Sequence, residues 1–306
     1  MQKYILVTTP SFCKFSDEPI QKLESRGIKI IEDYGLKKTT TLALSDTIKS
    51  QIVGVVVGLE KISGPIMSEL PKLRIIAKHG AGIDNIDVEA ASKNNIEITR
   101  VPGANAVAVA EATIGQIFNL SRSLALADRS LREGNWNRYY GDEINGKTLS
   151  IIGFGAIGKE VCKRAESLGM SVVVNDITLN KEIEARFVSF EEAMKLGDYI
   201  SIHLPLLDST YHIIDSKKIN MMKQNAYLIN FARGGLINDE DLIDALKSNR
   251  IAGAALDAFE NEPKVDSRYL ELENVVLTPH LGGFSKEALN KISKKCVEDI
   301  LEVVND

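Results

Sequence analysis

Short apolar runs alternate with amphipathic segments along nearly the whole chain. In the first third, the apolar runs KYILVTT, IKIIEDYG, GVVVG and LRIIAKHG predict β-strands at residues 3–9, 28–35, 54–58 and 73–80. Between them, EPIQKLESRG at 18–27 and GPIMSELPKL at 64–73 have the spacing of helices. Strands that are buried on both faces are almost continuously apolar, so this alternation predicts a parallel sheet covered by helices.

A second series of the same kind begins after residue 146. Further strands are predicted at residues 148–155, 171–176, 199–206, 226–235, 251–259 and 274–283, and a final helix at 285–306. Residues 105–134 predict one long helix, whose small residues favour close packing against another domain or subunit. Two strand-helix series predict an α/β fold with two doubly wound parallel-sheet domains.

Composition narrows the classes of protein to consider. The chain has 306 residues, of which 44% are hydrophobic and 26% charged, and its net charge of -5 argues against binding nucleic acid. No apolar stretch approaches a membrane span, and the N-terminal run is too short for a signal peptide. Cys13, Cys162 and Cys296 are few and widely spaced, which predicts reduced thiols in a cytoplasmic protein.

The segment Gly153-Phe154-Gly155-Ala156-Ile157-Gly158 stands between the run TLSII and the helix KEVCKRAESLG. This GxGxxG spacing is typical of a dinucleotide site. The first glycine permits a tight turn, the second lets the backbone approach a pyrophosphate, and the third lets the helix pack close to the sheet. The N-terminus of the helix offers N–H groups to the phosphates. The alternative is a glycine-rich turn without a ligand.

The next predicted strand, SVVVND, ends at Asp176, which lies 23 residues after Gly153. A carboxylate at this position can accept hydrogen bonds from both hydroxyls of the adenosine ribose and repel a 2′-phosphate. We therefore predict NAD rather than NADP as the cofactor. The structural alternative is that Asp176 caps the following segment.

Candidate catalytic groups follow strands of the second series. Arg233 comes after the run INFA, His280 lies in LTPHLGG, and the acids of DAFENEP follow another strand. Arginine keeps its proton and needs an anionic partner, which is either a ligand or a structural carboxylate. Hydride transfer needs one proton donor or acceptor, and imidazole suits neutral pH. Because strand carboxyl ends line the ligand crevice of open parallel sheets, we infer that these groups share one edge.

The remaining histidines have weaker claims. His203 is expected to line the cofactor or the core, and His212 to lie at the surface. No two histidines have helical ligand spacing and no acids cluster around them, so no metal site is expected. Arg233 in a structural ion pair, and Glu262 capping a turn before Pro263, are the structural alternatives to catalysis.

Six motifs follow one another along the chain: HGAGIDNID (79–87), GFGAIG (153–158), HLPLLDST (203–210), NFARGG (230–235), LDAFENEP (256–263) and TPHLGG (278–283). In this combination the sequence resembles the D-2-hydroxyacid dehydrogenase family over essentially its whole length, and most closely the D-3-phosphoglycerate dehydrogenase branch. The resemblance implies a flavodoxin-like substrate domain, residues 1–100 and 282–306, a Rossmann NAD domain, residues 101–281, and a cleft between them.

The resemblance also implies residue roles. Arg233 would bind the substrate carboxylate and polarise the carbonyl, His280 would be the general acid or base, and Glu262 would orient His280. The backbone amides of His79, Gly80, Ala81 and Gly82 would hold the carboxylate, with Lys78 as a point charge. Asp257 would reach the nicotinamide carboxamide, and Pro205 and Thr210 would flank the adenosine and phosphates. The further cofactor-binding positions implied are His203, Ala232, Gly282 and Gly283.

The substrate is less sharply indicated. The phosphoglycerate branch usually has an arginine near Val57 or Gly58, an arginine where this chain has Lys78, and an asparagine where it has Gly103. We place 3-phosphoglycerate first, which implies serine biosynthesis. Hydroxypyruvate, glyoxylate, and a sulfonate or phosphonate analogue are the alternatives. The chain ends at Asp306 without the C-terminal regulatory domain of some family members, so serine feedback through such a domain is not expected.

A different class of function is an NAD-sensing co-regulator without catalysis, because fold does not determine function. A formate dehydrogenase-like hydride abstractor is disfavoured because that relative pairs its histidine with glutamine, and residue 262 is a glutamate. The partners expected are a small 2-hydroxy or 2-oxo acid and a second copy of the chain in a homodimer, with neither nucleic acid nor membrane.

Overall fold

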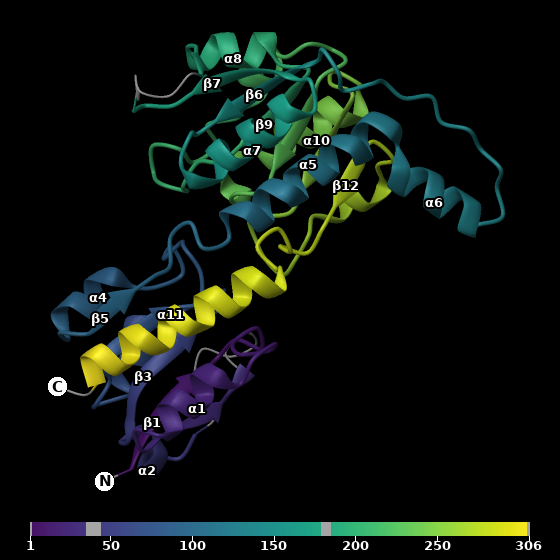
Figure 1. Ribbon diagram of the computed structural model, residues 1–306. Helices are drawn as coiled ribbons and strands as arrows, with labels where there is room; N and C mark the ends of the chain where they lie inside the picture. The colour runs from purple at the N-terminus through teal and green to yellow at the C-terminus, as the bar shows by residue number, and fades with distance from the viewer. Residues whose placement is uncertain (1, 35–43, 179–184, 305–306) are drawn as a thin grey trace. The chain divides into compact units, whose positions relative to one another are not determined.

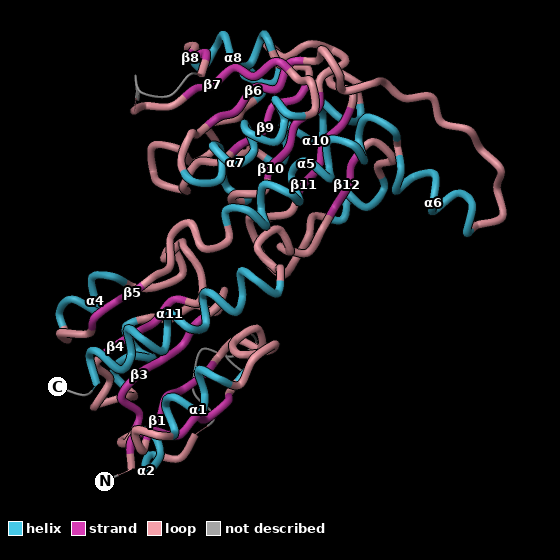
Figure 2. Tube along the Cα trace, viewed as in Figure 1, coloured by secondary structure: helices cyan, strands magenta, loops and turns pink. Residues whose placement is uncertain are grey.

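The computed structural model describes residues 2–34, 44–178 and 185–304. The chain divides into two compact units: unit 1 is Met1–Asn105 with Phe284–Asp306, and unit 2 is Ala106–Gly283. Each unit contains one sheet of parallel strands with helices packed on it (Figures 1 and 2). The predicted α/β class with two doubly wound parallel sheets is confirmed. The predicted changes of domain, after residues 100 and 281, lie close to the observed divisions.

Unit 1 has a five-stranded sheet in the order β2-β1-β3-β4-β5. Its strands are β1 (Lys3–Val7), β2 (Ile28–Glu32), β3 (Ile52–Val57), β4 (Ile75–Lys78) and β5 (Glu97–Thr99), of which β5 was not predicted. Its helices are α1 (Glu18–Glu24), α2 (Asp46–Lys49), α3 (Gly64–Ser68), α4 (Val88–Lys93) and α11 (Lys286–Val304). This strand order is the flavodoxin-like one. All six residues of β3 are buried, as the central strand of a doubly covered sheet should be.

Helix α11 joins the C-terminal part of the chain to unit 1. It packs against α1, β3 and β4 (Figure 1). Its apolar face, which includes Ile292, Cys296, Val297 and Ile300, enters the core on one side of the sheet. These contacts bury one face of α11, which has 19 residues. The helix therefore belongs to unit 1 although it lies far from the other elements of that unit in the sequence.

Unit 2 has a seven-stranded sheet in the order β12-β11-β10-β9-β6-β7-β8. Its strands are β6 (Thr148–Ile152), β7 (Ser171–Asn175), β8 (Arg186–Phe187), β9 (Tyr199–Ile202), β10 (Tyr227–Asn230), β11 (Gly253–Leu256) and β12 (Val275–Leu277). The described helices are α5 (Ala106–Arg122), α6 (Leu124–Arg132), α7 (Ala156–Ser167), α8 (Phe190–Leu196), α9 (Ser216–Ile219) and α10 (Asp239–Lys247), with short 3-10 turns at Gly234–Leu236 and Ser267–Glu271. The order reverses beside β6, as in a Rossmann domain.

The single long helix predicted over residues 105–134 is wrong, because the chain breaks it at Ser123. This residue is left-handed, with φ 51°, and separates α5 from α6. Two contacts stabilise the break. The side chain of Asn119 accepts a hydrogen bond from the amide of Ala125, and the carbonyl of Ser121 accepts one from Asp142. Asp142 lies outside the predicted segment and the side-chain bond of Asn119 leaves the apolar period unchanged, so periodicity could not reveal the break.

Candidate active site

The candidate active site lies where the strands of unit 2 end. The glycine loop follows β6, Asp176 follows β7, and His203 follows β9; Arg233, Asp257 and His280 come after β10, β11 and β12. All these strands are parallel neighbours, so their carboxyl ends form one edge of the sheet. Hydrogen bonds continue past the strands. The amide of Asp257 donates to Asn230 O at 3.0 Å, and that of His280 donates to Asp257 O at 2.8 Å.

The glycine loop has the shape that a pyrophosphate requires. A Cβ on Gly153, whose φ is 95°, would lie 2.7 Å from His203 O, and one on Gly158 would lie 2.3 Å from Gly153 O. A Cβ on Gly155 would meet no atom within 4 Å. The first and third glycines therefore serve internal packing, whereas the second faces open space at the start of α7. The amides that begin α7, from Ala156 onward, supply the N–H groups of a phosphate site.

Asp176 is held beside this loop. Its Oδ2 accepts a hydrogen bond from the amide of Phe154 at 2.6 Å, and its Oδ1 accepts one from Thr178 at 2.7 Å. Each carboxylate oxygen keeps a lone pair for a further donor. The ring of Phe154 is buried against Phe187, so this residue contributes to the core with its side chain and to Asp176 with its amide.

In the loop after β9, the side chain of Thr210 makes hydrogen bonds to the backbone of the same loop. Thr210 Oγ1 donates to Pro205 O at 2.7 Å and accepts from the amide of Leu207 at 2.8 Å. His203 Nε2 lies 2.9 Å from Ser201 Oγ, while its Nδ1 is buried without a hydrogen-bond partner in the described residues. Burial lowers the pKa of His203 to about 4, so the imidazole is neutral at physiological pH.

Arg233 is presented by a turn that the buried amide of Asn230 organises. Asn230 Oδ1 accepts from the amide of Ala232 at 3.0 Å, and its Nδ2 donates to Arg233 O at 2.8 Å. Arg233 is partly buried, and its Nη1 donates to Ala232 O at 2.9 Å. Sequence reasoning missed Asn230. Its signal is a primary amide at the last position of an otherwise apolar strand.

Close backbone packing requires glycine at position 234, directly after Arg233. A Cβ at this position would lie 2.0 Å from the carbonyl carbon of Phe259. The backbone of the segment that leads to Glu262 therefore packs directly against the turn after Arg233. The amide of Phe259 also donates to Glu262 Oε1 at 3.0 Å, which fixes the carboxylate within this segment.

His280 and Glu262 form a direct pair. His280 Nδ1 lies 2.9 Å from Glu262 Oε1 and 3.0 Å from Oε2. Burial alone would raise the pKa of Glu262, but the hydrogen bond and charge of His280, the amide of Phe259 and the charge of Arg233 outweigh it. The pKa of Glu262 therefore lies below its usual value. A carboxylate at Nδ1 favours the tautomer with its proton there and stabilises the imidazolium, so Nε2 is available for proton exchange.

Asp257 tethers the loop that carries His280. Its carboxylate accepts hydrogen bonds from Thr278 Oγ1 at 2.6 Å, from the amide of Leu281 at 2.8 Å and from the amide of Gly282 at 2.8 Å. Asp257 is only 2% exposed. Thr278 is a second residue that sequence reasoning missed. In the structure, Asp257 holds this loop in place. Its contact with nicotinamide stays a prediction, and so does the cofactor contact of Gly283.

In unit 1, the loop after β4 corrects part of the carboxylate prediction. The amide of His79 donates to Val57 O at 2.8 Å and that of Gly80 donates to Lys78 O at 2.8 Å. These two amides are therefore not available to a ligand. The amides of Ala81 and Gly82 make no hydrogen bond within the described residues, so of the four predicted amides these two can still donate to a ligand, and their contact with a carboxylate stays a prediction.

Lys78 is engaged within unit 1. Its Nζ donates to Asn85 Oδ1 at 2.6 Å and to the carbonyl of Gly58, and the residue is 3% exposed. A Cβ on Gly58 would lie 2.6 Å from Thr9 Oγ1, so a larger side chain at position 58 would displace Thr9. The predicted role of Lys78 as a point charge for a distal anion stays a prediction, and its contacts give it an alternative, structural role.

Comparison with known proteins identifies the family. Residues 114–282 match the family "D-isomer specific 2-hydroxyacid dehydrogenase, NAD binding domain". The chain is 39% identical to a D-3-phosphoglycerate dehydrogenase of Methanocaldococcus jannaschii, over 92% of this chain and 56% of that one. It is 35% identical to a glyoxylate reductase of Thermococcus litoralis, over 92% of this chain and 91% of that one. This protein belongs to the D-2-hydroxyacid dehydrogenase family.

A solved relative agrees. The crystal structure of D-lactate dehydrogenase from Aquifex aeolicus complexed with NAD and lactic acid matches with a TM-score of 0.84 and 26% identity, over 99% of this chain and 96% of that one. Unit 2 contains the NAD-binding domain of the family, and NAD is the cofactor. The open space at Gly155 and the carboxylate of Asp176 fit that cofactor. The chain spans about half the length of the D-3-phosphoglycerate dehydrogenase that it matches.

One further cluster in unit 2 holds the segment before Glu262 in place. Glu260 Oε1 accepts from Tyr211 Oη at 2.6 Å, and its Oε2 lies 3.4 Å from His212 Nε2. The ring of His212 stacks on that of Tyr211 with centroids 3.9 Å apart. His212, which was expected at the surface, is therefore only partly exposed and joins the loop after β9 to the segment after β11.

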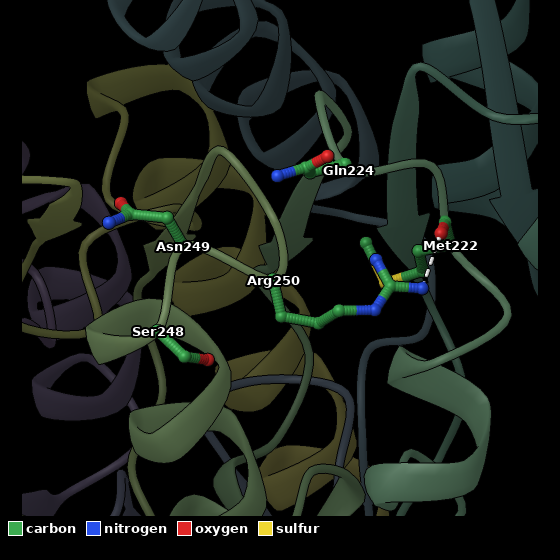
Figure 3. Close-up of a pocket in the computed structure, with 5 residues that line it drawn as sticks. All are labelled: Met222, Gln224, Ser248, Asn249 and Arg250. Atoms are coloured by element: carbon green, nitrogen blue, oxygen red, sulfur yellow. Dashed lines mark hydrogen bonds between the residues drawn. The ribbon is translucent and has the colours of Figure 1, made fainter.

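A cavity of about 510 Å³ in unit 2 lies away from these groups (Figure 3). Its lining residues are Met222, Gln224, Ser248, Asn249 and Arg250. They precede β10 and β11, so the cavity lies at the amino edge of the sheet, whereas the candidate site lies at the carboxyl edge. The guanidinium of Arg250 donates to the carbonyls of Asn220 and Met222, which indicates a structural role.

Proposed function

We propose that this protein catalyses NAD-dependent interconversion of a D-2-hydroxy acid and its 2-oxo acid, with Arg233, Glu262 and His280 as the catalytic residues. The observation that supports this most directly is the His280–Glu262 pair, with Nδ1 held 2.9 Å from the carboxylate at the same sheet edge as Arg233. When bound, NAD supplies or accepts the hydride. The protein must supply an anchor for the carboxylate and a group that exchanges the proton.

Each residue then has one task. His280 Nε2 donates a proton to the substrate oxygen in the direction of reduction and takes it back in oxidation. Glu262 keeps Nδ1 protonated and stabilises the imidazolium. Arg233 binds the substrate carboxylate and polarises the carbonyl with its planar guanidinium. The amides of Ala81 and Gly82 add two N–H groups to the carboxylate.

We place 3-phosphoglycerate and 3-phosphohydroxypyruvate first as the substrate pair, which would place the enzyme in serine biosynthesis. A relative named for that activity is 39% identical over 92% of this chain, and a hydroxypyruvate reductase of Thermotoga maritima is 39% identical over 81% of it, so identity gives both candidates equal support. Glyoxylate and hydroxypyruvate are the second candidates. They are favoured by the engagement of Lys78 with Asn85 and Gly58, because a cation held in this way is less suited to a phosphate.

A panel of 2-oxo acids with NADH tests the proposal. Phosphohydroxypyruvate, hydroxypyruvate and glyoxylate are compared by kcat/KM from the loss of nicotinamide absorbance. We expect turnover of at least one, with phosphohydroxypyruvate first. If neither these three nor a sulfonate or phosphonate analogue reacts while NADH binds normally, the result contradicts the proposed catalysis and favours an NAD-sensing co-regulator. A preference for glyoxylate would transfer the assignment to the second candidates.

Variants test the roles. Arg233→Lys keeps the charge but loses the guanidinium fork, so we expect kcat/KM to fall on the order of 10²-fold with NADH affinity unchanged. His280→Asn should lower kcat by about 10²–10⁴-fold. Equal loss of turnover and NADH binding in both variants would contradict these assignments.

We also propose a homodimer. Helix α6 and the chain after it project from the rest of unit 2 (Figure 1). They expose Leu131 by 57%, Trp136 by 79% and Tyr140 by 96%. Apolar side chains exposed together in this way are typical of an interaction surface, and a second copy would cover them. The cytoplasmic location stays a prediction; among the described helices, none is long and apolar enough to cross a membrane.

A further inference from the structure

His79 immediately precedes the loop Gly80-Ala81-Gly82, and its imidazole contacts two serines from distant parts of unit 1. Nδ1 lies 3.2 Å from Ser11 Oγ, in the segment after β1, and Nε2 lies 2.9 Å from Ser293 Oγ, on α11. The imidazole, Ser11 and Ser293 are all buried, with exposures of 8%, 7% and 1%. The edge of the Phe12 ring packs against the imidazole with centroids 5.9 Å apart.

One arrangement of donors and acceptors satisfies this cluster. The amide of Cys13 donates to Ser293 Oγ at 3.1 Å, and the hydroxyl of Ser293 keeps a proton that it can donate to His79 Nε2. Nδ1 then carries the imidazole proton and donates to Ser11 Oγ, which lies 2.9 Å from Thr9 Oγ1. In this arrangement the hydroxyl proton of Ser293 and the N–H proton of His79 are both donated within the cluster, and the imidazole is neutral. Burial, followed by the charge of Lys78, lowers the pKa of His79 to about 4, which agrees with that state.

The loop after His79 has one other described anchor ahead of Ala81, the carbonyl of Gly80, which accepts a hydrogen bond from the amide of Val101 at 2.8 Å. Gly80 and Gly82 have no side chain, and the amides of Ala81 and Gly82 make no hydrogen bond within the described residues. His79 therefore has the last side chain before these two amides, and both of its ring nitrogens are held by hydrogen bonds. Any rotation of the backbone at His79 would change the direction of the two N–H groups.

We propose that His79, held by Ser11 and Ser293, is a positioning residue that aims the amides of Ala81 and Gly82 at the substrate carboxylate. This inference rests on the proposed function. It changes the role expected for His79, whose side chain does not bind the substrate but connects the N-terminal segment and α11 to the loop that does. The effect must therefore appear in the affinity for the acid and leave the affinity for NADH unchanged.

His79→Leu tests the proposal because leucine fills a similar volume and cannot bond either serine. With the 2-oxo acid that the wild type reduces fastest, we expect KM to rise roughly tenfold while kcat changes less than about twofold. His79→Gln carries an amide near the position of Nε2 and should recover most of the affinity by bonding Ser293. NADH affinity, measured by nicotinamide fluorescence, should match the wild type in both variants.

Ser293→Ala removes one hydroxyl and leaves the imidazole in place, so it decides the question if His79→Leu fails to fold. We expect a several-fold rise in KM with little change in kcat. Ser121→Ala is the matched control, because Ser121 is also a buried helical serine, 2% exposed, whose hydroxyl donates to the carbonyl of Phe118 in unit 2. It should lower thermal stability by a similar amount and leave KM unchanged.

Equilibrium binding of oxamate, a carboxylate that cannot be reduced, separates the failure of this inference from that of the proposed function. Wild-type protein that binds oxamate but reduces no 2-oxo acid contradicts the proposed function, and the variants still report the role of His79 through oxamate affinity. An unchanged KM and oxamate affinity in His79→Leu or Ser293→Ala overturns the inference. So does a KM that rises equally in the Ser121→Ala control.

Discussion

Side chains at the end of β10 and in the segment after β11 determine how the charged groups are presented. Asn230 organises the turn before Arg233, Asp257 collects three donors from the loop that carries His280, and Glu262 bonds His280 itself. Buried polar groups must be satisfied, and a carboxylate that accepts several hydrogen bonds orders all of its donors at once. At the scale of single residues, these buried acceptors therefore set the geometry available for catalysis.

Asp257→Asn tests this directly. An amide nitrogen cannot accept a hydrogen bond, so at least one of the donors from Thr278, Leu281 and Gly282 loses its partner. We expect the free energy of unfolding to fall by about 1–3 kcal/mol in urea denaturation, with a lower kcat because the His280 loop is displaced. Asp208→Asn, an exposed change, should alter neither quantity. Unchanged stability of Asp257→Asn would contradict the tethering role.

The start of α7 illustrates how one element combines structural and ligand-binding glycines. A Cβ on Gly158 would lie 2.3 Å from Gly153 O, whereas a Cβ on Gly155 would enter open space. The fold itself therefore requires glycine at position 158. At position 155 the fold would accept a side chain, and glycine is needed there only to leave room for the ligand. The distinction depends on what each position faces, because both are glycines in the sequence.

Alanine at each position separates the two requirements. Gly158→Ala should lower the free energy of unfolding by about 1–3 kcal/mol, because the added methyl group cannot be accommodated without moving the helix. Gly155→Ala should change stability by less than about 1 kcal/mol and weaken NADH binding at least roughly tenfold. Urea denaturation and fluorescence titration measure the two quantities. Normal NADH affinity in Gly155→Ala would place the pyrophosphate elsewhere.

At the scale of the whole molecule, two enclosed imidazoles link stability to pH. The pKa of His79 and that of His203 are each lowered to about 4, first of all by burial. In the unfolded chain a histidine takes up its proton near pH 6.5. Between these values the unfolded chain binds more protons than the folded protein, so the free energy of unfolding falls as the pH falls from 6.5 to 4.

We expect a loss of roughly 1–2 kcal/mol for each histidine between about pH 7.5 and pH 5, measured by urea denaturation. The carboxylates whose pKa is lowered, such as Glu262 and Asp266, stay ionised over this range and contribute little to the change. His79→Leu should remove about half of the dependence. Stability that is constant over this range in the wild type would contradict the neutral, buried state of both rings.

Assembly is the second property at this scale. Sedimentation velocity should show a dimer for the wild type and a monomer for the double variant Leu131→Asp and Trp136→Asp, because charges would replace two exposed apolar side chains. Leu168→Asp is the control, since Leu168 is 38% exposed at the end of α7. A wild-type monomer would contradict the proposal, and so would dissociation caused equally by the control.

The fold class followed from the sequence because the period of apolar residues is a local property of the chain. Strands such as β3 and β10 are short apolar runs, and the alternation with helices is enough to predict parallel sheets. The glycine motif and Asp176 were also visible, since their spacing reflects a single strand-turn-helix unit. The local signals missed β5 and β8, which have three and two residues, and they missed the break at Ser123.

Only the tertiary structure decided what each candidate group faces. The amide of His79 bonds to Val57, the imidazole of His79 joins Ser11 to Ser293, and Gly234 lies against Phe259. Each of these facts depends on residues that lie far apart along the chain. A sequence pattern can therefore determine which elements form and which residue types carry the chemistry. Which of their polar atoms remain available to a ligand depends on the hydrogen bonds made when distant segments pack together.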